Sequence, residues 1–214
     1  MTDTLTPVLT AHWDQPDIFT IDGYRRAGGW QALPKALGMS RDEVIAVVRN
    51  AGLRGRGGAG FATGVKWNFL PKGDNKPHFL VVNADESEPG ACKDVPLMMA
   101  NPHLLIEGAA IASYAIGAGH AFIYVRGEVL HVIRRLRNAV QEARAAGYLG
   151  QNVLGSGVDV EVIIHAVSPL LGTSAAAAGA AGAAAVAAAS AGAAAGLSSA
   201  MPGVANTTDA QSAS

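Results

Sequence analysis

Hydrophobic positions along the chain switch between helical and strand periodicity, and this switching is the clearest guide to its architecture. The segment Ser40-Arg-Asp-Glu43 forms a capping box that begins a helix with apolar residues at positions 44, 45 and 48. Gly52 is placed to end that helix. The run Phe79-Leu-Val-Val82 is short, apolar and rich in β-branched residues, so it predicts a buried parallel strand.

The same switching continues toward the C-terminus. Asn101 and Pro102 predict the start of a second helix, and residues 121–125 predict a second strand. A third helix, ended by Gly147, places apolar residues on one face: Val129, Ile133, Leu136 and Val140. Residues 158–164 alternate as a further strand. The order β-α-β-α-β predicts an α/β fold with a parallel sheet.

The chain changes character after Ala166. Alanine and glycine dominate to about Leu197, and charged residues vanish until Asp209. We do not assign this tract as a membrane span, because alanine, glycine and serine contribute little to insertion and no basic flank supports it. We divide the chain into an N-terminal helical segment, an α/β domain and a low-complexity tail expected to be disordered: residues 1–39, 40–166 and 167–214.

Composition excludes several classes of protein. A chain of 214 residues permits one or two domains, and a net charge of −1 with 50% hydrophobic residues gives no electrostatic case for nucleic acid. The single cysteine, Cys92, excludes a disulfide framework within the chain, fits a reducing compartment and is expected to be buried. The first residues lack the basic and apolar regions of a secretory signal.

A glycine-rich loop follows the first predicted helix. Four glycines between Gly55 and Gly60 allow the backbone to approach a phosphate or a flat ring and to direct N–H groups at it. Lys66 could reach a phosphate, and Phe69 lies close by. The loop formally matches the dinucleotide fingerprint G-x-G-x-x-G, but it lacks the preceding strand that the fingerprint requires.

A dense acidic turn follows the strand at 79–82. Its sequence is Asn83-Ala-Asp-Glu-Ser-Glu-Pro-Gly90, at the strand's carboxyl end, where α/β proteins place ligand chemistry. Like charges so close together are unfavourable, which suggests contacts to ligand hydroxyls, ring N–H groups or a cation. The alternative is a solvated acidic turn before a helix.

With both motifs in hand, the chain resembles the NADH-binding flavoprotein subunit of bacterial respiratory complex I. The resemblance covers about residues 7 to 166. Relatives of that subunit include the diaphorases of NAD-reducing hydrogenases and formate dehydrogenases. The resemblance rests on the glycine loop, the acidic turn and four further segments: Lys93-Asp94, Asn101-Pro-His103, Phe122-Ile-Tyr-Val-Arg-Gly-Glu128 and Ala146-Gly-Tyr-Leu-Gly150.

The resemblance implies a Rossmann-like flavin domain that binds FMN noncovalently and transfers a hydride from NADH to it, before electrons pass to iron–sulfur clusters. Phe61 and Phe69 would stack on the adenine of NADH, although aromatic residues are more often core. Glu88 would seat the nicotinamide over the flavin as the catalytic residue. The residues that would contact FMN are Gly55, Gly57, Lys66, Asn83, Asp85 and Glu86.

The resemblance also implies partners and a location. The expected partners are a thioredoxin-like [2Fe–2S] subunit and the large iron–sulfur subunit of complex I, on the cytoplasmic face of the plasma membrane. The family's later domain binds a [4Fe–4S] cluster through four cysteines, and Cys92 alone cannot supply those ligands. We therefore expect no metal site in this chain.

The family pattern stops near Ala166, before the glutamates and glycines that complete its flavin pocket. We expect a truncated chain that retains FMN weakly or not at all and that is inactive alone. We hypothesise a frameshift in GC-rich coding sequence, which reading all three frames across the codons for Ile164 to Thr173 would test. The alternatives are a non-catalytic fragment, an interaction protein with a linker tail, or a diaphorase of an NAD-linked hydrogenase or formate dehydrogenase.

Overall fold

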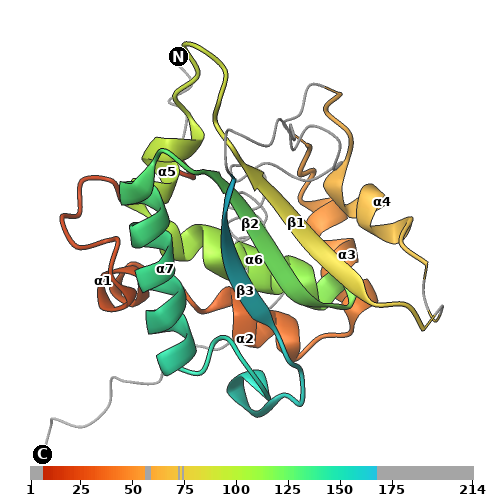
Figure 1. Cartoon of the computed structure of the whole chain (residues 1–214). Coiled ribbons are helices and arrows are strands. Elements are labelled where there is room, and N and C mark those ends of the chain that lie inside the picture. The colour runs from red at the N-terminus through yellow and green to blue at the C-terminus, as the bar shows by residue number, and fades with distance from the viewer. Residues whose placement is uncertain (1–6, 56–58, 72, 74, 168–214) are drawn as a thin grey trace, which may run out of the picture.

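The computed structural model of the chain describes residues 7–55, 59–71, 73 and 75–167, and it contains a three-stranded parallel sheet of order β1-β2-β3 (Figure 1). The strands are β1 (His78–Ala84), β2 (Ala118–Arg126) and β3 (Glu161–Val167). Helix α5 (Asp94–Ala100) and helix α6 (Pro102–Ile116) connect β1 to β2, and α7 (Leu130–Ala145) connects β2 to β3. The predicted α/β class and β-α-β-α-β order are confirmed.

The N-terminal part contributes four short helices, and a 3₁₀ turn (Val153–Gly155) precedes β3. The helices are α1 (Ile21–Arg26), α2 (Ala32–Leu37), α3 (Arg41–Asn50) and α4 (Thr63–Asn68). Helices α1, α2 and α3 contact α6, and their apolar residues belong to the same core cluster as those of the sheet. That core crosses the predicted boundary between residues 39 and 40, and the three-part division remains a prediction because residues 168–214 lie outside the described residues.

Local hydrogen bonds explain where the predicted elements begin. Ser40 and Glu43 form the expected capping box at the start of α3. The Asn101 Oδ1 accepts from the Leu104 N–H at 3.2 Å and caps α6. The third strand starts at Glu161, three residues later than predicted, because Val160 forms an antiparallel bridge with Gly150 instead.

The two faces of the sheet differ. Helix α6 contacts all three strands and α7 packs on β3, so this face is buried in the core. On the other face, side chains lie in rows set by the strand register and are largely or partly exposed. The rows, from the amino toward the carboxyl end of the strands, are Phe79, His120 and Glu161; Val81, Phe122 and Ile163; and Asn83, Tyr124 and His165.

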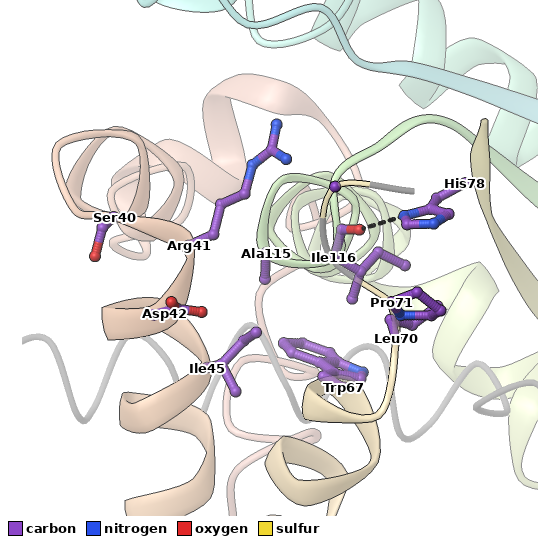
Figure 2. A pocket seen from close by; sticks show the side chains of 11 residues that line it. Ser40, Arg41, Asp42, Ile45, Trp67, Leu70, Pro71, His78, Ala115 and Ile116 are labelled. Carbon is purple, nitrogen blue, oxygen red and sulfur yellow. Dashed lines mark hydrogen bonds between the residues drawn. The ribbon is translucent and has the colours of Figure 1, made fainter. Parts of the chain in front are cut away.

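A pocket of about 310 Å³ lies at the amino end of β1, between α3, α4 and the end of α6 (Figure 2). Arg41, Trp67 and His78 are among its lining residues, and His78 Nδ1 lies 3.2 Å from the Ile116 carbonyl oxygen. The acidic turn follows the opposite end of β1, six residues on, which is about 20 Å away at the rise of a strand. This pocket is therefore separate from the predicted nucleotide site.

Among the described helices, one bent pair has the length and composition that a membrane span requires. Within the described ranges, no single helix is long and apolar enough to cross a bilayer. Helices α5 and α6 satisfy that criterion only when taken together, and the chain bends by 101° between them. Most of α6 is buried inside the protein.

A buried carboxylate on α6 organises the N-terminal helices. Glu107 is 2% exposed, and its carboxylate accepts the Tyr24 O–H at 2.7 Å. It also accepts three backbone N–H groups, from Trp30 at 2.9 Å, Ala32 at 3.0 Å and Leu33 at 3.1 Å. Burial raises the pKa of Glu107, and these donors oppose that rise only in part. All four partners donate, so the geometry satisfies the ionised carboxylate.

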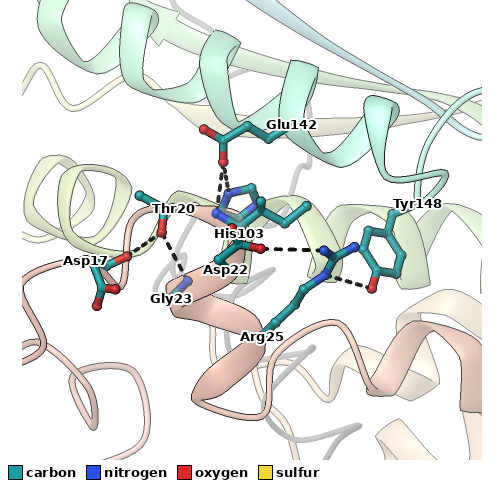
Figure 3. A network of polar contacts seen from close by, with 9 residues as sticks. Asp17, Thr20, Asp22, Gly23, Arg25, His103, Glu142 and Tyr148 are labelled. Carbon is teal, nitrogen blue, oxygen red and sulfur yellow. Dashed lines mark hydrogen bonds and ion pairs between the residues drawn. The ribbon is translucent and has the colours of Figure 1, made fainter.

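A second polar contact joins α6 to α7 (Figure 3). His103 is fully buried, and its Nε2 lies 3.0 Å from the Glu142 carboxylate, which also accepts the Ile21 N–H at 2.9 Å. The imidazole stacks on the Tyr24 ring with centroids 5.9 Å apart. Burial lowers the pKa of His103, and the Arg25 charge acts in the same direction, while Glu142 opposes them.

We predict that Glu107→Ala destabilises the protein by about 3 kcal/mol or more, because it leaves buried N–H donors unsatisfied. Urea denaturation followed by circular dichroism measures the change. Glu128→Ala is the control, since Glu128 is 46% exposed and its ion pair with Arg126 is a surface contact that contributes little to stability. Equal losses in the two variants would contradict the role of Glu107.

The lowered pKa of His103 predicts a loss of stability in mild acid. The unfolded chain binds this proton more readily, so stability is fully present above the ordinary histidine pKa of about 6.5. It falls as pH drops below that value, by at most about 1.4 kcal/mol per pH unit. Urea denaturation at several pH values gives the free energy of unfolding as a function of pH. Its fall toward acid should be smaller in His103→Gln and unchanged in His120→Gln, a substitution at an exposed position. A slope that His103→Gln leaves intact would refute the prediction.

Candidate functional site

The glycine-rich loop connects α3 to α4 and is closed at its base by backbone hydrogen bonds. Gly55 N–H donates to the Phe61 carbonyl at 2.7 Å, and Thr63 N–H donates to the Leu53 carbonyl at 2.9 Å. Gly60 has φ +60°, a conformation that favours glycine. Residues 56–58, including the predicted Gly57, lie outside the described residues. The loop follows a helix, as predicted.

Two exposed phenyl rings lie at either end of α4. Phe61 is 48% exposed, Phe69 is 70% exposed, and their ring centroids are 6.0 Å apart with planes at 47°. The alternative that these residues belong to the core is therefore wrong. Lys66 is exposed on the same helix, whereas Trp67 is buried against the core. The arrangement offers an aromatic surface beside a cation.

The start of the acidic turn is an ordered continuation of β1. Asn83 Oδ1 accepts the Asp85 N–H at 3.0 Å, and Ser87 Oγ donates to Asp85 Oδ1 at 2.6 Å. Asn83 and Asp85 are both partly exposed at the carboxyl edge of the sheet. The structure therefore places two predicted FMN contacts at the edge where parallel sheets bind ligands.

Glu86 has a structural function that the sequence did not reveal. Its carboxylate accepts backbone N–H groups from Lys93 at 2.6 Å, Asp94 at 3.0 Å and Val95 at 3.0 Å, and so caps α5. Burial raises the pKa of Glu86, but these three donors outweigh burial and lower it overall. An FMN contact for Glu86 remains a prediction.

Glu88 and Cys92 lie on the exposed side of the same turn. The Glu88 side chain is exposed, and its carbonyl accepts the Ala91 N–H at 3.0 Å. Its predicted catalytic role remains a prediction. Cys92 is exposed, so the expectation of a buried thiol is wrong. Cys92 lies in the loop between the acidic turn and α5, which begins at Asp94.

Two residues that the sequence analysis left without a role lie at the end of β2. Arg126 Nε is 3.2 Å from Glu128 Oε2. Glu128, chiefly through its hydrogen bond, raises the pKa of Arg126, and the charge of Asp85 adds to this effect. The positive charge of Arg126 therefore offsets part of the negative charge of the acidic turn. Its position at a strand's carboxyl end was the available signal, as it was for Asn83.

Asp94 adds a buried carboxylate beside this edge. It is 4% exposed; one oxygen pairs with Lys93, and Oδ1 has no hydrogen-bond partner within the described part of the chain. No group of three or more His, Cys, Asp or Glu side chains in that part could hold a metal ion. The carboxyl edge thus carries amide and carboxylate oxygens and the Arg126 guanidinium, while the glycine loop, Lys66 and the exposed rings of Phe61 and Phe69 lie between the end of α3 and the end of α4.

A parallel sheet with such an edge defines a nucleotide-binding α/β domain. The family of Nuo51 FMN-binding domains matches residues 48–185, and the chain belongs to that family. It is a homologue of the F subunit of NADH-quinone oxidoreductase. It is 63% identical over 162 residues to the Streptomyces coelicolor protein and 49% identical over 162 residues to the Aquifex aeolicus protein.

The similarity covers unequal shares of the two chains. The Streptomyces coelicolor alignment spans 76% of this chain and 36% of the relative, and the Aquifex aeolicus alignment spans 76% and 38%. The chain therefore spans little more than a third of these relatives. An NAD⁺-reducing [NiFe]-hydrogenase in the H2-reduced state superimposes with a TM-score of 0.62 at 27% identity, over 90% of this chain and 35% of the other.

The hydrogen bonds of Glu86 predict that Glu86→Ala destabilises the protein by about 1 to 2 kcal/mol through loss of the α5 cap. Glu88→Ala is the matched control two residues away, and its effect should stay within about 0.5 kcal/mol. Thermal and urea denaturation of both variants measure the difference. If Glu86→Ala is as stable as the parent, the cap does not hold α5.

Proposed function

We propose that this chain binds FMN and NADH and forms the NADH-oxidising site of an NADH-quinone oxidoreductase. The observation that carries the proposal is the match to a family of FMN-binding domains, which covers both the glycine loop after α3 and the acidic turn at the carboxyl end of β1. FMN held by these residues would supply the chemistry of hydride acceptance from NADH and of one-electron release. The chain's own residues would bind the two ligands, orient them relative to each other and shield them from water.

The residues of the glycine loop and of the acidic turn fit the chemistry of FMN. Gly55 and Gly57 leave room for close approach of the backbone, and the exposed Lys66 supplies a charge for the phosphate. Asn83 and Asp85 present an amide and a carboxylate to ring or ribityl donors, and Glu86 holds α5 beside them.

NADH would bind above the same edge. Phe61 and Phe69 are exposed and adjacent, as a stacking surface for adenine requires. Glu88 is exposed on the turn that follows β1, where its carboxylate can accept a hydrogen bond from the nicotinamide carboxamide. In this role Glu88 touches the reacting dinucleotide and orients it.

Two further proposals concern the assembly. The identity of 63% to a protein of NADH-quinone oxidoreductase, against 27% to an NAD⁺-reducing hydrogenase, favours the first of these two enzymes. The partners would be a thioredoxin-like [2Fe–2S] subunit and a large iron–sulfur subunit, with the complex attached peripherally to the cytoplasmic face of the membrane.

A second candidate is a non-catalytic FMN-binding unit. Past Ala166 the sequence lacks the glutamates of the family pattern, and Cys92 is its only cysteine. Fewer contacts to the flavin mean weaker retention. Binding and turnover must therefore be measured separately.

The experiment is an FMN titration of the purified chain by flavin fluorescence, followed by NADH-dependent ferricyanide reduction at saturating FMN. We expect saturable binding with a Kd on the order of micromolar or weaker, and little flavin retained after gel filtration. Absence of saturable binding would overturn the proposal. Binding without turnover would select the non-catalytic candidate.

Variants in the same experiment separate the two ligands. Phe61→Ala and Phe69→Ala should each weaken NADH binding about three- to tenfold and leave FMN binding unchanged, because one aromatic stacking contact contributes about 0.5 to 1.5 kcal/mol. Phe79→Ala is the matched control, since this ring is 53% exposed at the amino end of β1. Equal effects of all three substitutions would argue against an adenine site at α4.

A further inference from the structure

On the sheet face that no described helix covers, a polar row includes Asn83, one of the predicted FMN contacts. Asn83 on β1 pairs in register with Tyr124 on β2, and Tyr124 pairs with His165 on β3. These three residues share a face because they lie at paired positions of adjacent parallel strands. The row lies close to the carboxyl edge, one residue before Ala84 ends β1.

Tyr124 and His165 form a compact aromatic pair. Their ring centroids are 4.8 Å apart with planes at 56°, Tyr124 is partly exposed, and His165 is exposed. Neither residue has a predicted role from the sequence. A phenol and an imidazole each combine a flat face with a group able to donate or accept a hydrogen bond.

The neighbouring row has the opposite character. Val81, Phe122 and Ile163 precede the polar row by two residues on each strand, which is about 6.6 Å. Ile163 is 37% exposed and the other two are partly exposed. The face therefore changes from apolar to polar toward the edge. An isoalloxazine ring changes in the same way, from a dimethylbenzene end to a pyrimidine end with two carbonyls and one N–H.

We propose that Tyr124 and His165 are FMN-binding residues that, with Asn83, receive the polar end of the flavin ring. The proposal rests on the FMN function proposed above and extends its site from β1 across β2 and β3. Asn83 Oδ1 accepts the Asp85 N–H, which leaves the Asn83 amide N–H groups as donors to a ring carbonyl. The Tyr124 hydroxyl and the His165 imidazole supply the remaining contacts, and the Tyr124 ring adds a stacking surface.

The nearest cation on this face is already paired, so the row of Asn83, Tyr124 and His165 is not expected to bind the phosphate of FMN. Arg126 continues the same face of β2, but its guanidinium is paired with Glu128. The phosphate of FMN is assigned to the glycine loop and Lys66. Tyr124 and His165 should therefore recognise the ring, whether or not a phosphate is attached.

The test is a fluorescence titration of the full chain with FMN and with riboflavin, which lacks the phosphate. Tyr124→Ala and His165→Ala should each raise the Kd for both flavins at least fivefold, with an unchanged ratio between them. Lys66→Ala should raise the Kd for FMN alone. Tyr124→Phe should keep most of the affinity, because it keeps the stacking ring.

The same face provides a matched control pair. Phe79 and His120 are also paired in register, with ring centroids 6.2 Å apart, at the amino end of the strands. Phe79→Ala and His120→Ala should leave both affinities within twofold of the parent. Circular dichroism of the bound flavin, which reports the surroundings of the ring, should change in His165→Ala and not in His120→Ala.

The outcomes separate this inference from the function it rests on. A parent chain without saturable FMN binding would overturn both. A parent chain that binds FMN, with Tyr124→Ala and His165→Ala within twofold of it, would overturn this inference alone. Loss of FMN binding with riboflavin binding intact would also overturn it, because the residues would then serve the phosphate.

Discussion

The structure depends on the hydrogen bonds that Glu107 accepts at the centre of α6. Helix α2 begins without a side-chain cap of its own, and the first N–H groups of a helix have no partner within it. Glu107 accepts those of Ala32 and Leu33, together with the Trp30 N–H and the Tyr24 hydroxyl. A buried charge that lost these donors would be strongly unfavourable, so the N-terminal helices and α6 must fold as one unit. The glycine loop follows directly from that unit through α3.

The same solution recurs at the candidate site. Helix α5 also lacks a side-chain cap from its own N-cap residue, Lys93, and receives the carboxylate of Glu86 from the turn before it. An acidic residue that the sequence suggests as a ligand contact therefore holds a helix in place. Asp85 differs, because its carboxylate accepts the Ser87 hydroxyl and stays partly exposed at the edge. In one acidic turn, Glu86 thus stabilises the fold and Asp85 presents a carboxylate that a ligand could reach.

The elements were predictable because their signals are local. The capping box at Ser40 and the Asn101 cap appear as expected, and the apolar face of α7 is buried at Ile133, Leu136 and Val140. The prediction was less accurate where a distant or irregular contact intervened. The bridge between Gly150 and Val160 delays the start of the third strand, and Cys92 lies exposed in the loop before α5. The exposure of Phe61 and Phe69 could not be read from composition, since aromatic residues are more often buried.

The sequence by itself determined the β-α-β-α-β alternation, the helix that begins at Ser40, the parallel α/β class and the motifs that place the chain among Nuo51 FMN-binding domains, but not the short helices α4 and α5. These follow from periodicity, capping and short motifs, which act over a few residues. Only the tertiary structure decided that Glu107 caps a helix more than seventy positions away, and that Asn83, Tyr124 and His165 form one row. The physical reason is that strand register and buried polar pairing are set by packing between distant segments, and no local pattern specifies which donor will meet which acceptor.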